Sequence, residues 1–290
     1  MNRIIVLDGV KAGAILLIVF IHLYNYLVYH PFTGHHGLIA LLSSLALAGF
    51  TFVSGYTIYA NNSVIRTREE IIRFYRKRVL RVYPLYVVAL ATFFICFQVL
   101  RFFPPLDLSL IEWLINAFCL QVLLAPAFTD PVFTLWFIGF IVLLYLLYPA
   151  IIMFSRTTIG TILISGGIFA LLAALHLTLN IVDVRLLQYY FFFVAGIVAA
   201  RSGVTCSRFG AGFRGRGAGI VVVSYAAYGV YLFHMPAFAV AAVIIGRLGL
   251  PWYLHDAVMC AVVVPALFAI AYSIQRNYDL RIKTKTGQKN

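Results

Sequence analysis

Residues 7–27 read LDGVKAGAILLIVFIHLYNYL, an apolar run that contains three ionisable side chains. A run of about 20 apolar residues predicts a transmembrane helix, and an ionisable group inside one is costly enough to suggest a function. Lys11 and His22 are eleven residues apart, or about three helical turns, so they share one face of that helix. Asp8 lies about 40° from the same face. The run therefore predicts a spanning helix with one polar stripe.

The remainder of the chain is equally apolar. Hydrophobic residues make up 63% of its 290 residues and charged residues 11%, with a mean hydropathy of +0.98. This composition excludes a soluble globular domain of this size and predicts a polytopic membrane protein. Eight apolar runs, one of them short, are expected to cross the membrane: 7–28, 37–60, 82–103, 133–154, 159–179, 187–200, 218–245 and 250–274.

A ninth apolar segment, Leu110 to Ala125, is bounded by Pro104-Pro105 on one side and Pro126 on the other. It is shorter than the roughly 20 residues that a spanning helix needs, so we expect it to be re-entrant or interfacial. The sequence thus predicts an all-α transmembrane helix bundle of about eight full spans plus this short segment. We expect a single transmembrane domain over residues 1–290.

The net charge of +13 is explained by membrane topology. If both termini lie in the cytoplasm, 19 of the 22 basic residues fall on the cytoplasmic side, and the exceptions are Arg101, Arg185 and Arg247. Cytoplasmic loops of membrane proteins are enriched in basic residues in this way. The pattern predicts a multi-pass protein of the cell (inner or plasma) membrane, and it makes a nucleic-acid partner unnecessary.

The cysteines and loop histidines do not form a metal motif. Adjacent His35 and His36 lack a third ligand at a suitable spacing. The four cysteines are widely separated and show no C-x-x-C spacing: Cys96, Cys119, Cys206 and Cys260. We therefore expect no metal site and no bound cofactor.

A basic segment, residues 61–84, lies between the second and third apolar runs. Its apolar residues recur at helical spacing, and its many arginines occupy the remaining surface, which predicts an interfacial amphipathic helix that leads directly into the third span. One interpretation is a surface for the headgroups of membrane lipids. The other is a cytoplasmic site for a phosphorylated ligand, because Arg78 and Arg81 are neighbours at i,i+3 and guanidinium groups suit phosphate.

Two histidines lie deep inside predicted spans, at comparable depth. A neutral imidazole accepts a proton readily, so His22 and His234 are both candidates for a general base, and the alternative for each is a buried histidine bonded to a neighbouring helix. Trp136 opens the fourth full span, where an aromatic belt is also expected. Ser54 and Gly55 are small residues of the kind that allow helices to approach closely in membranes.

Five motifs in order resemble the acyltransferase-3 family of integral-membrane acyltransferases. LDGVKAGAILLIVFIH resembles that family's arginine followed eleven residues later by histidine, FVSGY its serine-glycine, and RVLRVYP its arginine-x-x-arginine. LWFIGFIVLLYLLYP resembles its tryptophan span, and VSYAAYGVYLFHMP, which contains Tyr225, its last signature. Lys11 stands where the family has arginine, and the family's glutamate after the tryptophan is absent from Gly139, Phe140 and Ile141.

The resemblance implies an O-acyltransferase whose donor is acyl-CoA, usually acetyl-CoA, bound from the cytoplasm near Arg78 and Arg81. It implies that the acyl group passes to a hydroxyl of a surface glycan or lipid-linked sugar, with His22 as base. Asp8 and Lys11 would support His22, and the second-rank candidates are His234, Trp136, Ser54 and Tyr225. Two alternatives stay open: a transporter or flippase for a glycan or small solute, and a non-catalytic member of the family.

Overall fold

The structure, a computed structural model, describes residues 4–29, 35–204 and 218–286. Within these ranges the chain forms helices joined by short connections and contains no strand, which confirms the predicted all-α class. Eight of the described helices are long and apolar enough to cross a membrane. The contacts divide the chain into two compact units.

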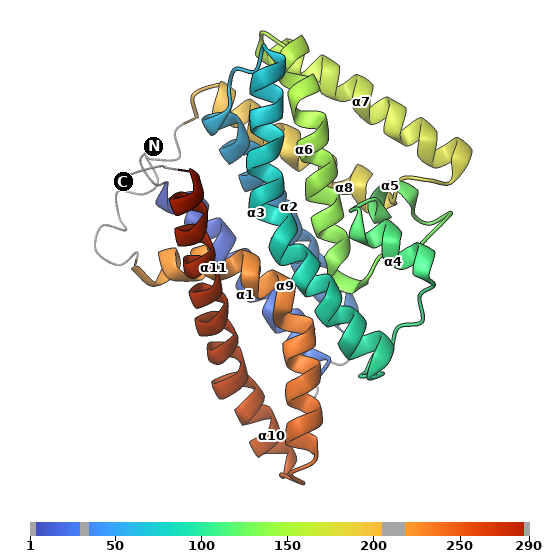
Figure 1. Ribbon diagram of the computed structural model, residues 1–290, viewed down its shortest axis with the longest axis vertical. Coiled ribbons are helices and arrows are strands. Elements are labelled where there is room, and N and C mark those ends of the chain that lie inside the picture. The colour runs from blue at the N-terminus through green and yellow to red at the C-terminus, as the bar shows by residue number, and fades with distance from the viewer. Residues whose placement is uncertain (1–3, 30–34, 205–217, 287–290) are drawn as a thin grey trace. The chain divides into compact units, whose positions relative to one another are not determined.

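The first unit comprises residues 1–46, 92–105 and 206–290. Its core is built from α1 (Ile5–Tyr24) and α9 (Ala218–Gly246), with a third, interrupted helix formed by α10 (Trp252–Val258), η4 (Met259–Val263) and α11 (Val264–Thr286). Figure 1 shows α9 beside α11, and α9 also packs along α1. Helix α9 is therefore the central element of this unit.

Two properties of α9 matter for the arrangement of side chains. Its ribbon bends along its length, and it contains Pro236, which cannot donate to the carbonyl one turn earlier and so accounts for a kink. Gly229 brings α9 close to α11, since a Cβ at this glycine would lie 3.1 Å from the Cβ of Ala271. The small residue lets the two backbones approach, as is common between membrane helices.

Both ends of the first unit are closed by polar contacts. Near the start of α9, the Tyr225 hydroxyl donates to Asp279 of α11 at 2.6 Å, so these two helices are antiparallel. At the far end, the amides of Val28 and Tyr29 donate to the Asp256 carboxylate at 2.8 and 2.9 Å. The segment after α1 is thereby tied to the start of the interrupted helix, and α1 ends at Tyr24 instead of extending to residue 28.

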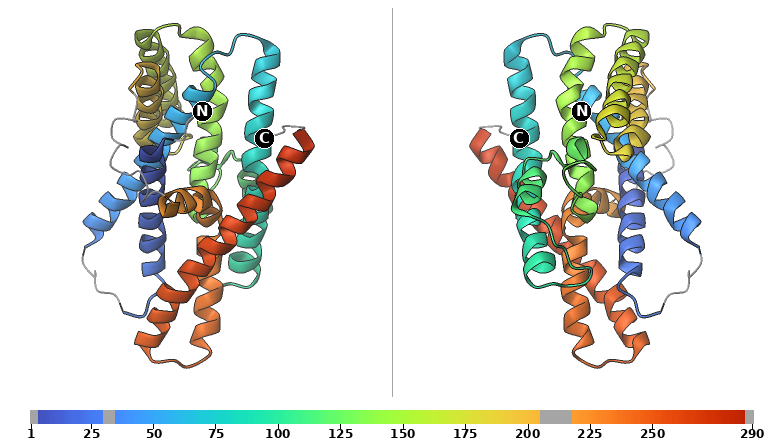
Figure 2. Two further views of the ribbon diagram at one scale, coloured as in Figure 1. Left: turned by 90° about the vertical axis from the view of Figure 1, so that its left-hand side faces the viewer. Right: turned by 90° about the vertical axis from the view of Figure 1, so that its right-hand side faces the viewer.

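The second unit comprises residues 47–91 and 106–205. It contains most of α2 (His36–Asn61) and α3 (Arg68–Phe93), together with α6 (Trp136–Phe154), α7 (Thr158–Leu179) and α8 (Val184–Arg201). Helix α7 packs against both α6 and α8, which can be followed in Figure 2. The predicted runs agree with these helices except at the third, which begins at Arg68 and continues through η1 (Phe94–Val99). The basic segment is thus the first part of one long helix.

The short ninth segment forms two helices and is not one of the spanning candidates. Helix α4 (Leu110–Ala117) has eight residues and α5 (Gln121–Leu124) has four. Ser109 and Glu112 form a reciprocal capping box that begins α4, which satisfies amides that would otherwise lack partners. At about 1.5 Å per residue neither helix is long enough to cross a bilayer.

Helices α2 and α8 are in very close contact within the second unit. A Cβ at Gly55 would lie 2.1 Å from the carbonyl oxygen of Phe193, and one at Gly196 would lie 2.2 Å from that of Phe52. Each glycine therefore accommodates the backbone of the other helix. This confirms the interpretation of Gly55 as a residue that permits a close helix contact.

Candidate active site

The polar stripe of α1 lies at the edge of the face that packs in the first unit. That face contains small and branched apolar residues: Leu7, Ala12, Ala14, Ile15, Ile18, Val19 and Leu23. Lys11 and His22 are half-buried beside it, and Ile15, between them along the helix, is completely buried. The helical face predicted from spacing is therefore present.

Asp8 is bonded across the helix pair. Its Oδ1 accepts the Ser224 hydroxyl of α9 at 2.7 Å, and both side chains are buried. This contact lies at the opposite end of α1 from His22, fourteen residues away, or about 21 Å at the helical rise. Asp8 therefore contributes to the packing of α1 on α9 and does not touch His22.

His22 is paired with His234. Their ring centroids are 5.1 Å apart and the rings are tilted by 47°. His234 is completely buried, whereas His22 is half-buried. Since Asp8 and Ser224 begin their helices and His22 and His234 lie further along, α1 and α9 run parallel with both histidines at one depth.

The His234 ring is held by its own helix. Its Nδ1 is 2.8 Å from the carbonyl oxygen of Tyr231 and 3.1 Å from that of Val230. The other nitrogen, Nε2, is buried and has no hydrogen-bond partner among the described residues. The ring of Phe238 packs edge-on at 6.0 Å. One nitrogen of this histidine is thus satisfied and the other is not.

The second unit contains a half-buried arginine, Arg78. Its guanidinium lies 5.3 Å from the ring centroid of Tyr145 on α6 and 5.4 Å from that of Phe74. Its Nε is buried without a hydrogen-bond partner, and no carboxylate of the described residues lies within ion-pair distance. Arg81, one turn later, is exposed. Of the two predicted donor-binding arginines, only Arg78 is set into the bundle.

Ser54 also meets Tyr145. The Ser54 and Tyr145 hydroxyls are 3.0 Å apart, which joins α2 to α6 beside Arg78. One turn along α6, the Tyr148 hydroxyl donates to the carbonyl of Asn62 at 2.7 Å, and its ring stacks on Phe74 at 5.4 Å. Ser54 and Arg78, predicted separately, therefore belong to one cluster in the structure.

Arg201, the last residue of α8, is half-buried and was not a candidate in the sequence analysis. It donates to the Ser155 carbonyl at 2.9 Å, to the Ser155 hydroxyl at 3.1 Å and to the Thr161 hydroxyl, and it lies 5.6 Å from the Tyr59 ring centroid. These partners are neutral and come from three separate segments. In the sequence Arg201 was one basic residue among several on the cytoplasmic side, and no local pattern marked its contacts.

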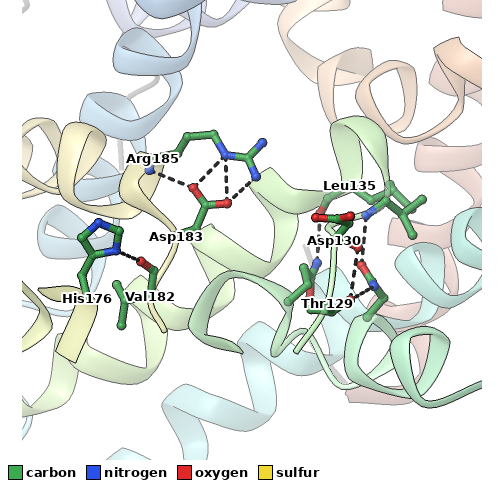
Figure 3. A network of polar contacts seen from close by, with 10 residues as sticks. Thr129, Asp130, Leu135, His176, Val182, Asp183 and Arg185 are labelled. Atoms are coloured by element: carbon green, nitrogen blue, oxygen red, sulfur yellow. Dashed lines mark hydrogen bonds and ion pairs between the residues drawn. The ribbon is translucent and has the colours of Figure 1, made fainter. Parts of the chain in front are cut away.

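Trp136 lies at the opposite end of α6 from Tyr148. The guanidinium of Arg185 stacks on its ring at 4.3 Å, and Arg185 also forms an ion pair with Asp183, as Figure 3 shows. The same figure shows His176 Nδ1 at the Val182 carbonyl, 2.8 Å away. Trp136 is thus a packing partner of an ion-paired arginine at this end of the unit.

Among the described residues, no group of three or more His, Cys, Asp or Glu side chains is placed to hold a metal ion. Three of the cysteines are free thiols: Cys96, Cys119 and Cys260. Burial raises the pKa of the Cys119 thiol to about 12. A thiol with such a pKa remains protonated and unreactive at neutral pH.

The structure therefore shows two polar centres, one in each unit. His22 and His234 form the first, with Asp8, Lys11 and Tyr225 toward the other end of the same helices. Arg78, Ser54 and Tyr145 form the second. A half-buried imidazole suits proton transfer, and a half-buried guanidinium without a carboxylate suits an anionic ligand.

Eight described helices long and apolar enough to cross a membrane define a multi-pass membrane protein. A family model for an acyltransferase domain, that of the acyltransferase-3 family, matches residues 4–225. The match covers most of the chain, which therefore belongs to this family and is a membrane acyltransferase. His234 lies beyond the matched residues. No curated protein and no solved structure matches the chain.

Proposed function

We propose that this acyltransferase transfers an acetyl or other short acyl group from cytoplasmic acyl-CoA to a hydroxyl of a surface glycan or lipid-linked sugar. The observation that supports it most is Arg78, a guanidinium packed against two aromatic rings, whose buried Nε has no hydrogen-bond partner among the described residues. A CoA donor has phosphates, which guanidinium groups bind well. Arg81, exposed one turn later, extends the same basic surface.

His22 is the general base in this proposal. It removes the proton from the acceptor hydroxyl while the hydroxyl oxygen attacks the thioester carbonyl. The carbon–sulfur bond then breaks, and the proton passes from His22 to the leaving thiolate, so that the products are the ester and the free thiol of CoA. A positioned base contributes on the order of 10² to 10⁴ in rate.

The remaining candidates have supporting roles. Asp8 bonds Ser224 and holds the start of α1 against α9, which sets the direction in which the Lys11 and His22 face points. Lys11 keeps a positive charge near the end of α1 that we expect to face the cytoplasm, although an ammonium lacks the bidentate geometry of a guanidinium. Tyr225 bonds Asp279 and fixes the same end of α9 to α11.

Transfer of labelled acetyl from acetyl-CoA, measured in membranes that contain the protein and a glycan-bearing lipid fraction, tests the proposal. We expect wild type to transfer label and His22→Ala to lose at least about 10²-fold of the rate. His36→Ala is the matched control, because His36 is an exposed histidine at the start of α2. Full activity of His22→Ala would remove His22 from the mechanism. Donor binding without any transfer by wild type would instead indicate a non-catalytic member.

A further inference from the structure

The His234 ring has a defined tautomer. Both partners of its Nδ1, Val230 and Tyr231, present carbonyl oxygens, which only accept hydrogen bonds. Nδ1 therefore carries the hydrogen. Because the ring is completely buried and no carboxylate of the described residues bonds to it, the imidazole is neutral and Nε2 presents a lone pair.

No donor among the described residues bonds to that lone pair. A buried acceptor without a partner costs free energy, so an unpaired buried nitrogen requires an explanation. Three rings surround His234: His22 at 5.1 Å, Tyr231 at 5.9 Å and Phe238 at 6.0 Å between centroids. Phe238 has no polar hydrogen, and of the other two His22 is the nearer and the one from another helix.

The spacing of the two imidazoles fits a direct bond. An N–H···N bond of about 2.9 Å, added to the two ring radii, separates the centroids by about 5 Å. The observed separation is 5.1 Å. The separation therefore allows an N–H of His22 to reach Nε2 of His234 after a rotation of the His22 ring in place.

The two rings differ in access. His22 is half-buried at the end of α1, whereas His234 has no exposed surface. An acceptor hydroxyl can therefore reach His22 and not His234. Any contribution of His234 to the reaction has to act through His22.

We propose that His234 is a positioning residue that accepts an N–H of His22 and thereby fixes the His22 tautomer. This inference rests on the proposed role of His22 as general base. With one nitrogen donating to His234, the other nitrogen of His22 keeps its lone pair and faces the acceptor hydroxyl. When His22 takes the hydroxyl proton, both of its nitrogens carry hydrogen, and the His234 lone pair stabilises the resulting cation until the proton passes to the leaving thiolate. A third group that orients a base in this way is a general device of nucleophilic catalysis.

Two substitutions separate this role from a structural one. In His234→Gln the amide oxygen takes the place of Nε2, so the acceptor for His22 is kept and the bond to the α9 carbonyls is lost. In His234→Asn the amide nitrogen takes the place of Nδ1, so the bond to Val230 and Tyr231 is kept and the acceptor is lost. Each variant therefore removes the function of one ring nitrogen and keeps that of the other.

We expect His234→Asn to lower kcat by about 10²-fold with little change in KM, and His234→Gln to retain most of kcat. The reverse order, or equal losses in both, would show that His234 serves only the packing of α9. Tyr231→Phe is the control for the other nearby donor, and it should leave kcat unchanged; a loss there matching that of His234→Asn would transfer the role to Tyr231.

A measurement that needs no turnover keeps this inference separate from the proposed function. In protein labelled with ¹⁵N-histidine, the nitrogen shifts report the tautomer of each neutral ring, and His22→Ala assigns the His22 signals. We expect a single His22 tautomer in wild type and in His234→Gln, and a mixture in His234→Asn. A mixture in wild type would overturn the proposal even if transfer is observed, and a single tautomer would support it even if transfer is not. Should the His234 variants fail to fold, the wild-type spectrum and the response of the His234 Nε2 signal to His22→Ala decide the question.

Discussion

Arg78 differs from the other basic side chains of α3 in its surroundings. Arg73, Arg76, Lys77 and Arg81 are exposed, whereas Arg78 is half-buried between the rings of Phe74 and Tyr145. Contact with aromatic faces stabilises a guanidinium partly out of water. The aromatic rings do not neutralise the charge, which is consistent with the proposal that Arg78 binds an anion.

The proposed role of Arg78 in donor binding has a direct kinetic test. Because a charge-assisted hydrogen bond contributes about 1.5 to 3 kcal/mol, we expect Arg78→Gln to raise the KM for acetyl-CoA about 10- to 100-fold. Arg78→Lys should recover part of this loss, because lysine keeps the charge without the planar fork. Arg76→Gln, in the same helix but exposed, is the control and should leave KM near wild type. An unchanged KM in Arg78→Gln would contradict the assignment.

Gly139 of α6 is a position at which a side chain would meet a buried polar group. A Cβ at Gly139 would lie 2.7 Å from the amide of Gln121, which is completely buried. The Gln121 amide donates to the Tyr86 hydroxyl at 3.3 Å and to the Leu135 carbonyl at 3.2 Å. The space beside Gly139 is thus filled by a polar group from α5, and a longer side chain there would displace it.

At the scale of elements, the contact of α2 with α8 depends on two glycines. Each lies against a backbone carbonyl of the other helix, at a distance that no side chain tolerates. The carbonyl belongs to a helix and cannot move without moving the helix. This contact therefore fixes how closely the two elements of the second unit approach.

Gly55→Ala should destabilise the protein by about 1 to 3 kcal/mol, because its Cβ would overlap the Phe193 carbonyl by far more than relaxation can absorb. Thermal unfolding in detergent, followed by loss of soluble protein, measures the effect. Gly166→Ala in α7 is the matched control, since nothing lies within 4 Å of a Cβ there and alanine favours a helix by up to about 1 kcal/mol. Equal stability of the two variants would show that α2 and α8 are not held at this distance.

For helix α3, the sequence pattern predicted the helix itself, and the structure added which of its side chains points inward. The spacing of apolar residues correctly predicted a helix continuous with the third span, and Val79 on its apolar side is exposed, as a lipid-facing residue would be. The inward position of Arg78 was not predicted, because it depends on Phe74 stacking on Tyr148 of α6. A helical wheel contains no information about that partner helix.

At the scale of the whole molecule, the number of spans has a topological consequence. An even number of crossings, such as the eight candidate helices would make, places both ends of the chain on one side of the membrane. We propose that this side is the cytoplasm, because 19 of the 22 basic residues then lie on it. Arg156 then lies in a cytoplasmic connection and Arg247 in an external one. Both side chains are exposed.

Cysteine labelling tests this arrangement in intact cells. In a variant whose own cysteines are replaced by alanine, we expect an impermeant maleimide to modify Arg247→Cys and not Arg156→Cys. After permeabilisation both should react, which controls for the accessibility of Arg156→Cys. Labelling of Arg156→Cys alone in intact cells would invert the topology, and labelling of both would contradict the number of crossings.

The sequence by itself determined the helices, their membrane character and the identity of His22 and Arg78 as candidates. These depend on local properties: an apolar run must satisfy its backbone hydrogen bonds within the helix, and a charged group inside such a run is conspicuous. Only the tertiary structure decided which groups meet. Asp8 and Ser224 are 216 residues apart, and Arg201 meets Ser155 across 46 residues. Helix packing likewise brings His22 beside His234, of whose two ring nitrogens only one has a hydrogen-bond partner among the described residues. The periodicity of a single helix specifies which face is buried and not which helix covers it.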